Sequence, residues 1–211
     1  MKKVIVPLDT RSYDILIGKD LISNFPSYLE GILSRNFLAI VTDKNVENVH
    51  LPRLIRALSA SGIETKILSI DPGESSKSWN TLQMTVDWML ASKIERNDIV
   101  VALGGGVVGD LVGFAAAIVR RGIRFIQCPT SLLAQVDSSV GGKTGINTIH
   151  GKNLVGAFYQ PSKVIADIST LNTMKDRDFL AGYGEVVKYG LLGDYDFYCW
   201  LETNFAKIKE R

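Results

Sequence analysis

Short β-rich runs alternating with helical patterns limit the fold of this chain more than any other feature. The runs are rich in valine, isoleucine, leucine and phenylalanine, and they cover residues 3–6, 13–17, 37–41, 65–70, 99–103, 125–128 and 164–166. The clearest helical patterns between them cover residues 46–61, where Leu51, Leu54 and Leu58 share one face, and residues 79–91. This alternation predicts an α/β fold, with a Rossmann-like parallel sheet and helices on both faces.

The pattern changes near Thr173, after which only helical spacing remains. It continues through residues 181–193 and 197–209 and reaches Arg211 without a capping signal. We therefore predict an α/β domain over residues 1–172 and the beginning of an all-helical domain over residues 173–211. On this interpretation the chain ends inside its second domain.

Charge and hydropathy exclude several classes of protein. The 24 basic and 22 acidic residues are spread along the sequence, so a nucleic-acid partner is not expected. The longest apolar stretch, residues 111–119, would span about 14 Å as a helix and cannot cross a membrane. Cys128 and Cys199 have neither metal-type nor redox-type spacing. We expect reduced thiols in a soluble, cytoplasmic protein.

Residues 129–153 concentrate groups that can bind an anionic substrate. Two Gly-Lys pairs, at Lys143 and Lys152, are accompanied by hydroxyl, amide and carboxylate side chains: Asp137, Ser138, Ser139, Thr144 and Asn153. Glycines admit a ligand close to the backbone, and lysines supply point charges for phosphate. Residues 138–144 resemble the tail of a Walker A motif, but Asp137 stands where that motif begins with glycine. A carboxylate there would repel a nucleotide phosphate, which argues against a P-loop.

The predicted strand 99–103 runs into a glycine-rich turn with the G-x-G-x-x-G spacing, at residues 104–109. Such a turn offers backbone N–H groups and a helix N-terminus to a pyrophosphate. The acidic residue usually found about twenty positions later is missing. Asp43, followed by Asn45, instead stands just beyond the earlier strand 37–41. Two interpretations stay open: Asp43 accepts ribose hydroxyls, or it caps the following helix.

Glu185 and Lys188 lie three apart on a predicted helix. They form either a surface ion pair of about 0.3 kcal/mol or a partly buried carboxylate that is paired or bound to a metal. The two histidines, His50 and His150, are each expected to be solvated or locally bonded. No complete metal site can be assembled from these residues.

Taken together, six segments closely resemble the 3-dehydroquinate synthase family of sugar phosphate cyclases. They are PGESSK at 72–77, GGGVVGDLVGFAAA at 104–117, RRG at 120–122, PTSLLAQVDSSVGGKTGIN at 129–147, GKNLVGAFYQP at 151–161 and GYGEVVKYG at 182–190. The resemblance implies a lyase that uses NAD and a divalent metal, zinc or cobalt. Its substrate would be 3-deoxy-D-arabino-heptulosonate 7-phosphate, converted into 3-dehydroquinate and phosphate on the shikimate route to aromatic compounds.

Matched residue by residue, the resemblance assigns roles to the candidate site. It implies NAD contacts from Asp43, Asn45, Pro72, Gly73, Glu74, Ser75, Ser76, Lys77, Gly105, Gly106, Val107, Val108, Gly109, Asp110, Thr130, Ser131, Lys143, Lys152, Thr170, Leu171, Asn172 and Thr173. The implied substrate-facing residues are Asp137, Lys143, Lys152, Asn153 and Lys188, with Glu185 as a metal ligand. Arg121 matches an arginine that reaches the substrate phosphate of a neighbouring subunit, which implies a homodimer.

The family's two histidine metal ligands lie in a helical region beyond the part matched here. We therefore expect the cofactor-binding half of such an enzyme, through truncation, proteolysis or a split gene, with weak NAD binding and little or no turnover. Three alternatives stay open: another sugar phosphate cyclase, a metal-dependent glycerol or alcohol dehydrogenase, and an NAD-binding subunit without catalysis.

Overall fold

The structure is a computed structural model that describes residues 1–210. Its main sheet has seven strands in the order β1-β2-β9-β6-β5-β3-β4. Their bounds are Lys2–Val6 (β1), Tyr13–Gly18 (β2), Phe37–Asp43 (β3), Glu64–Ile70 (β4), Ile99–Gly104 (β5), Arg124–Pro129 (β6) and Lys163–Asp167 (β9). All neighbours pair in parallel except β1, which lies antiparallel on β2. The connection between these two strands is long enough for a hairpin but too short for a parallel crossover.

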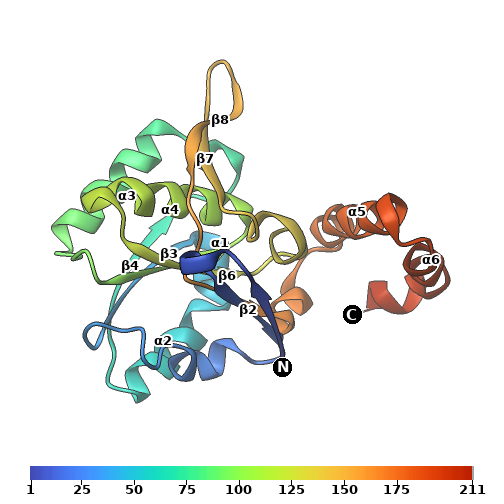
Figure 1. Cartoon of the computed structure of the whole chain (residues 1–211), viewed down its shortest axis with the longest axis horizontal. Helices are drawn as coiled ribbons and strands as arrows, with labels where there is room; N and C mark the ends of the chain where they lie inside the picture. The colour runs from blue at the N-terminus through green and yellow to red at the C-terminus, as the bar shows by residue number, and fades with distance from the viewer. Residues whose placement is uncertain (211) are drawn as a thin grey trace.

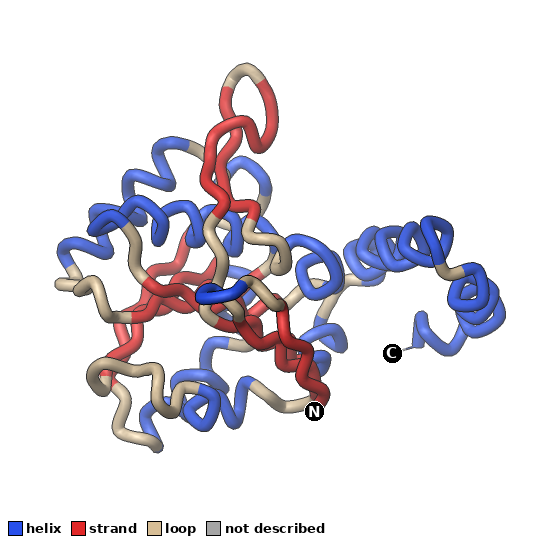
Figure 2. Tube along the Cα trace, viewed as in Figure 1, coloured by secondary structure: helices blue, strands red, loops and turns tan. Residues whose placement is uncertain are grey.

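Helices cover both faces of this sheet, as predicted (Figures 1 and 2). Helix α2 (Leu51–Ala60) and the 3-10 segment η2 (Ile22–Tyr28) pack on one face, and α3 (Trp79–Ala91) and α4 (Gly106–Ile118) pack on the other. Successive residues of β3 point to opposite faces, so Leu38 joins the first core and Ala39 the second. Burial on both faces explains why the central strands are continuously apolar in sequence.

The helix predicted over residues 46–61 is two helices, so that prediction was wrong. Helix α1 (Lys44–Val49) ends at His50, and α2 begins at Leu51 with Pro52 in its first turn. Proline has no N–H to donate to the preceding turn, and its ring clashes with a helical carbonyl there. The chain therefore changes direction at His50.

A two-stranded hairpin, β7 (Lys143–Thr148) and β8 (Gly151–Phe158), was not predicted from the sequence. Its strands consist largely of glycine, threonine, asparagine and lysine and lack the apolar alternation that marks a half-buried strand. The tip of the hairpin projects from the body in Figure 1. Its base lies on α4 because Gly113 has no side chain: a Cβ there would be 2.4 Å from Cγ2 of Thr144.

Two helices follow the 3-10 segment η6 (Ile168–Thr173): α5 (Asp176–Gly193) and α6 (Tyr195–Glu210). They extend to one side of the sheet body in Figure 1, in agreement with the predicted helical pattern. Helix α5 contacts the body at Gly182, where a Cβ would lie 2.7 Å from the amide nitrogen of Leu133. No helix within residues 1–210 is long and apolar enough to cross a membrane.

Asp167, at the end of β9, fixes the chain that leads into η2. Its carboxylate is fully buried and accepts hydrogen bonds from the amides of Asp20 and Ile22, each at 3.0 Å. It also accepts from the amide and hydroxyl of Ser169, at 3.0 and 2.6 Å. The guanidinium of Arg53 lies 3.5 Å away. One buried carboxylate thus joins segments that are distant in sequence.

Replacing this carboxylate should leave several buried donors unsatisfied. We expect Asp167→Ala to lower the free energy of unfolding by about 3 kcal/mol or more, measured by urea denaturation at pH 7. Asp20→Asn is the matched control, because Asp20 also pairs with Arg53 but its side chain is 69% exposed. A loss below about 1 kcal/mol for Asp167→Ala would contradict this account.

Candidate functional site

The sheet topology places the candidate site at the carboxyl ends of β3 and β5. The chain leaves β3 through α1 and α2 toward β4, whereas it leaves β5 through α4 toward β6 on the other side. In an open parallel sheet this reversal of direction opens a crevice outside the strand ends. Thr42 and Leu103 are register partners there, so Asp43 and Gly104 follow them side by side.

The glycine-rich turn presents the N-terminus of α4 to this crevice. Gly105 is the N-cap, with no side chain capping the first amides of a helix 13 residues long. The turn has little room for side chains: a Cβ on Gly106 would lie 2.8 Å from Oγ of Ser138. Free amides and the helix dipole favour an anion, so the turn fits the pyrophosphate of a dinucleotide.

Asp43 caps α1. Its Oδ1 accepts hydrogen bonds from the amides of Asn45 at 2.9 Å and Val46 at 3.1 Å. The capping interpretation is therefore confirmed. Both bonds go to Oδ1, so Oδ2 stays available to a ribose hydroxyl. The interpretation that Asp43 also accepts hydrogen bonds from a ribose therefore stays open.

Lys77 lies at the centre of a polar network between the loop after β4 and the hairpin. It is 4% exposed, and its ammonium is 2.5 Å from Oδ2 of Asp110 in the first turns of α4. The same ammonium donates to Oδ1 of Asn153 in β8. Three segments therefore meet at one buried cation.

Asp110 is the anionic partner of Lys77 and is itself largely buried. Its pKa is raised because burial outweighs the opposing hydrogen bond and attraction from Lys77. The nearby carboxylates of Glu74 and Asp137 act in the same direction. Lys77 is thus the cation that partly offsets the desolvation of this carboxylate.

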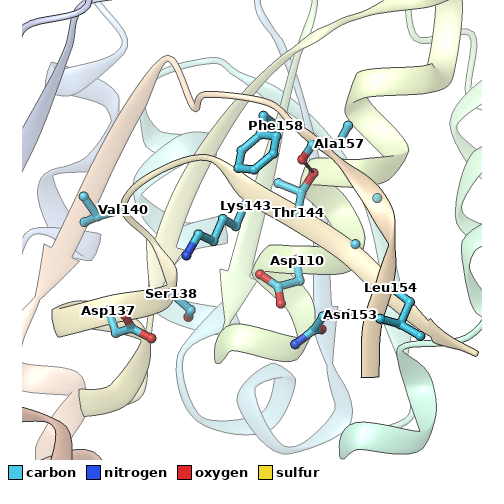
Figure 3. Close-up of a pocket in the computed structure, with 12 residues that line it drawn as sticks. Asp110, Asp137, Ser138, Val140, Lys143, Thr144, Asn153, Leu154, Ala157 and Phe158 are labelled. Atoms are coloured by element: carbon cyan, nitrogen blue, oxygen red, sulfur yellow. Dashed lines mark hydrogen bonds between the residues drawn. The ribbon is translucent and has the colours of Figure 1, made fainter. Parts of the chain in front are cut away.

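A cavity of about 470 Å³ opens beside this pair. Six residues singled out from the sequence line it, from α4, a π-helical turn η5 (Ala134–Ser138) and both hairpin strands: Asp110, Asp137, Ser138, Lys143, Thr144 and Asn153. Figure 3 shows the Lys143 side chain extending across the cavity toward Ser138 and Asp137. From α5, Tyr189 donates a 3.3 Å hydrogen bond to Asp137. The cavity therefore combines one cation with two carboxylates, an amide and hydroxyls, a set suited to a polyhydroxylated anion.

The remaining predicted residues do not line the cavity. Lys152 is exposed on the hairpin, 3.9 Å from Glu74. Arg121 is exposed, with a positive φ of 64°. Thr170 is buried and donates to the carbonyl of Asp167, and Thr173 ends η6. The roles given to these residues by the family resemblance stay predictions.

Glu185 and Lys188 form an ion pair along α5. Hydrogen bonding to Lys188 lowers the pKa of Glu185, and the same contact raises the pKa of Lys188. Within residues 1–210 no group of three or more histidine, cysteine, aspartate or glutamate side chains could hold a metal ion. Glu185 can supply one carboxylate ligand, but the described residues do not fit a complete metal centre.

His50 differs from its prediction as a solvated or locally bonded residue: it is 4% exposed and bonds across the fold. Its Nε2 lies 2.9 Å from Oγ1 of Thr173, which donates its own proton to the carbonyl of Thr170. Nε2 therefore carries the proton and donates, and the buried Nδ1 has no hydrogen-bond partner among the described residues. Burial, together with the charge of Arg53, lowers the pKa of His50, against a smaller opposing effect of Asp167.

Comparison with known proteins places the chain in a family. Residues 67–181 match the model of the family described as 3-dehydroquinate synthase N-terminal. The chain belongs to the 3-dehydroquinate synthase family. A 3-dehydroquinate synthase from Ruegeria sp. is 58% identical over 94% of this chain and 53% of its own length. The chain thus spans about half the length of the curated relatives it matches.

Solved structures of related cyclases share the fold. A 2-epi-5-epi-valiolone synthase from Streptomyces hygroscopicus subsp. jinggangensis, with NAD+ and Zn2+ bound, has a TM-score of 0.88 and 31% identity. The match covers 98% of this chain and 57% of the chain of that synthase. A 2-deoxy-scyllo-inosose synthase complexed with carbaglucose-6-phosphate, NAD+ and Co2+ has a TM-score of 0.81 and 28% identity, over 89% of this chain and 50% of its own. The Rossmann-like fold predicted for the family is confirmed.

Sequence reasoning did not include Asn147 in the site. The structure places it in hydrogen bonds with Glu74 and Asn153, both of which were predicted site residues. The available signal was its position between the two Gly-Lys pairs, in a segment already assigned to ligand binding. Its partner Glu74 is 73 positions away in sequence, so this contact cannot be found without the fold.

Replacing Lys77 by an uncharged residue should leave the buried carboxylate of Asp110 without its cation. We expect Lys77→Met to destabilise the chain by about 2–4 kcal/mol at pH 7 in urea unfolding. The loss should shrink as pH falls, because an unpaired Asp110 has a folded-state pKa above its unfolded value and is best tolerated when protonated.

Lys44→Met is the control, because Lys44 lies at the same distance, 2.5 Å, from Asp71 but both side chains are more than half exposed. It should cost no more than about 0.5 kcal/mol. Equal losses for Lys77→Met and Lys44→Met would refute the role of burial.

His50 should make stability depend on pH. Protonation would place a proton on Nδ1, which is buried and faces no acceptor among the described residues. Because the folded-state pKa is lowered, stability is present above the unfolded pKa of about 6.5 and is lost as pH falls below it. Unfolding measured between pH 7.5 and 5.5 should show a component that His50→Gln removes and that the exposed-site control His150→Gln leaves. An identical pH slope in His50→Gln would contradict this assignment.

Proposed function

We propose that this chain forms the NAD-binding part of a 3-dehydroquinate synthase. The reaction would convert 3-deoxy-D-arabino-heptulosonate 7-phosphate into 3-dehydroquinate and phosphate, on the shikimate route to aromatic compounds. The observation that carries the proposal is the convergence of Asp137, Lys143 and Asn153 on one cavity, beside Asp110 and the N-terminus of α4. A phosphorylated polyol and a dinucleotide would then meet between the glycine turn and the hairpin.

The crevice supplies the dinucleotide site. In it, the amides at the start of α4 bind the pyrophosphate, Asp43 accepts a ribose hydroxyl at Oδ2, and the loop of Glu74 and Lys77 lies along the nicotinamide half. Ser131, whose Oγ would lie 3.4 Å from a Cβ on Gly105, closes the turn from the other side. A bound NAD would supply reversible hydride chemistry at the substrate carbon that bears a secondary hydroxyl, whose O–H hydrogen leaves as a proton. Both related cyclases described above were solved with NAD+.

The cavity supplies the substrate site. Lys143 provides the positive charge for the phosphate, and Asp137 and Asn153 orient hydroxyl groups by hydrogen bonds. Fixing the leaving phosphate beside the proton it removes lowers the entropic part of the barrier. A sugar phosphate analogue is bound in the related 2-deoxy-scyllo-inosose synthase, which supports a phosphorylated substrate here.

Further parts of the proposal concern the whole enzyme. Residues 1–172 form the NAD domain and residues 173–211 begin a helical domain, in which Glu185 supplies one ligand to a zinc or cobalt ion and Lys188 contacts substrate. Lys152 and the segment Thr170, Leu171, Asn172 and Thr173 contribute to ligand binding from the rim. Arg121 reaches the phosphate of a neighbouring subunit in a homodimer. The protein acts in the cytoplasm, where its free thiols, Cys128 and Cys199, stay reduced.

Calorimetric titration of the 211-residue chain with NAD+ tests the cofactor site. We expect saturable binding that Asp43→Asn weakens by about tenfold, through loss of a ribose contact of about 1.4 kcal/mol. Stability should stay unchanged, because asparagine caps a helix as well as aspartate does. Asp87→Asn, on the exposed face of α3, is the charge-matched control. Absence of NAD+ binding by the unaltered chain would refute the proposal.

Phosphate release in the presence of the heptulosonate phosphate, NAD+ and zinc tests catalysis by the same chain. We expect none, because the described residues do not assemble a metal centre. Release with stoichiometric cyclised product would show that the chain completes the active site alone. Release of phosphate with a different cyclised product would favour another sugar phosphate cyclase.

A further inference from the structure

Asn147 occupies an irregular position in the hairpin. Ile146 pairs with Val155, but Thr148 pairs with Gly151, so the register shifts between these pairs. Asn147 alone therefore faces the three residues of β8 between those partners. Such bulges turn a side chain out of the regular ladder and direct it elsewhere.

This position gives Asn147 three hydrogen bonds to predicted site residues. Its backbone amide donates to the carbonyl of Lys77 at 2.8 Å. Its side-chain Nδ2 donates to Oε1 of Glu74 at 2.8 Å, and its Oδ1 accepts from the amide of Asn153 at 2.9 Å. Asn147 thus joins the loop after β4 to the hairpin. Each of its polar groups except the backbone carbonyl takes part in one of these bonds.

The bond to Asn153 has a specific consequence. Asn153 has a φ of 58°, in the left-handed region, and its Oδ1 accepts a hydrogen bond from the ammonium of Lys77. Asparagine tolerates this region better than most residues but does not prefer it. Holding the Asn153 amide therefore fixes the direction of its side chain toward Lys77 and the cavity.

We propose that Asn147 is a positioning residue for the cofactor site: it holds Glu74 and Lys77 in the arrangement that binds NAD, and through Asn153 it couples that arrangement to the substrate cavity. This inference rests on the proposed function and adds to it a residue that acts through its contacts with Glu74, Lys77 and Asn153. Asn147 is only half-buried. A contribution through positioning should therefore change ligand affinity more than stability.

Asn147→Asp is the informative change because it keeps the shape and the acceptor for Asn153. It removes the donor to Glu74 and places two carboxylates together. Adding Glu74→Gln restores a hydrogen bond with donor and acceptor exchanged, which a role in packing alone would not require. Asn204→Asp on α6 is the matched control, since Asn204 donates only to the local carbonyl of Trp200 at 2.8 Å among the contacts described.

The measurement is the dissociation constant of NAD+ by calorimetry for the chain, both single variants, the double variant and the control. We expect Asn147→Asp to weaken binding about tenfold and Asn204→Asp to leave it within twofold. The double variant should bind at least threefold more tightly than the product of the two single effects predicts. Urea unfolding should show that Asn147→Asp stays folded.

The outcomes separate the inference from the proposed function. Failure of the unaltered chain to bind NAD+ refutes the proposed function, and the inference falls with it. Binding by the unaltered chain with Asn147→Asp within twofold of it, or with strictly additive effects in the double variant, overturns the inference alone. If Asn147→Asp does not fold, Asn147→Ser is measured instead, and unfolding of both variants shows a structural role and also overturns the inference.

Discussion

The buried ammonium of Lys77 is the interaction on which the arrangement of this site depends. It bonds to Asp110 at the start of α4 and to Asn153 in the hairpin, while its own backbone belongs to the loop after β4. A desolvated lysine is costly unless it is paired and fully hydrogen-bonded. The three segments are therefore held in one arrangement, because moving any of them away would remove at least one of the two contacts that satisfy this buried charge.

The rigid and the adaptable parts of the site have different physical origins. The glycine turn and Asp43 end strands whose side chains are buried on both faces, so the crevice is fixed by the apolar core. The hairpin is only partly anchored in this core: Ile146 is buried in it and Val155 packs against it, whereas Ile149, Leu154 and Phe158 are exposed. Hydrogen bonds with Lys77 and Asn147 add to this apolar anchor in placing Asn153 relative to the crevice. A dinucleotide in the crevice and a substrate in the cavity would therefore affect each other through Lys77.

The parts of the fold that the sequence predicted follow from local signals. Continuous apolar runs identified the strands of the main sheet, and the pattern at residues 79–91 coincides with α3. The hairpin was not predicted, because its strands carry glycines for close approach and polar groups for binding, which removes the apolar period. The break at His50 was signalled by Pro52, but the regular spacing of leucines on either side concealed it. In the hairpin, ligand binding requires glycines and polar groups at positions where a regular strand would carry alternating apolar side chains.

The site shows a similar division. Lys143, Asp137 and Asn153 were identified because an unusual set of residue types lies close together in sequence, and the structure brings these three around one cavity. The contacts of Asn147 and His50 could not be predicted, since their partners lie on segments that meet only after folding. In both cases one polar side chain bridges segments that are distant in sequence: Asn147 joins the loop after β4 to the hairpin, and His50 joins the α1–α2 break to η6. Residues that bind a ligand are constrained by its chemistry and can be found in sequence, whereas residues that position them are constrained only by the geometry of the fold.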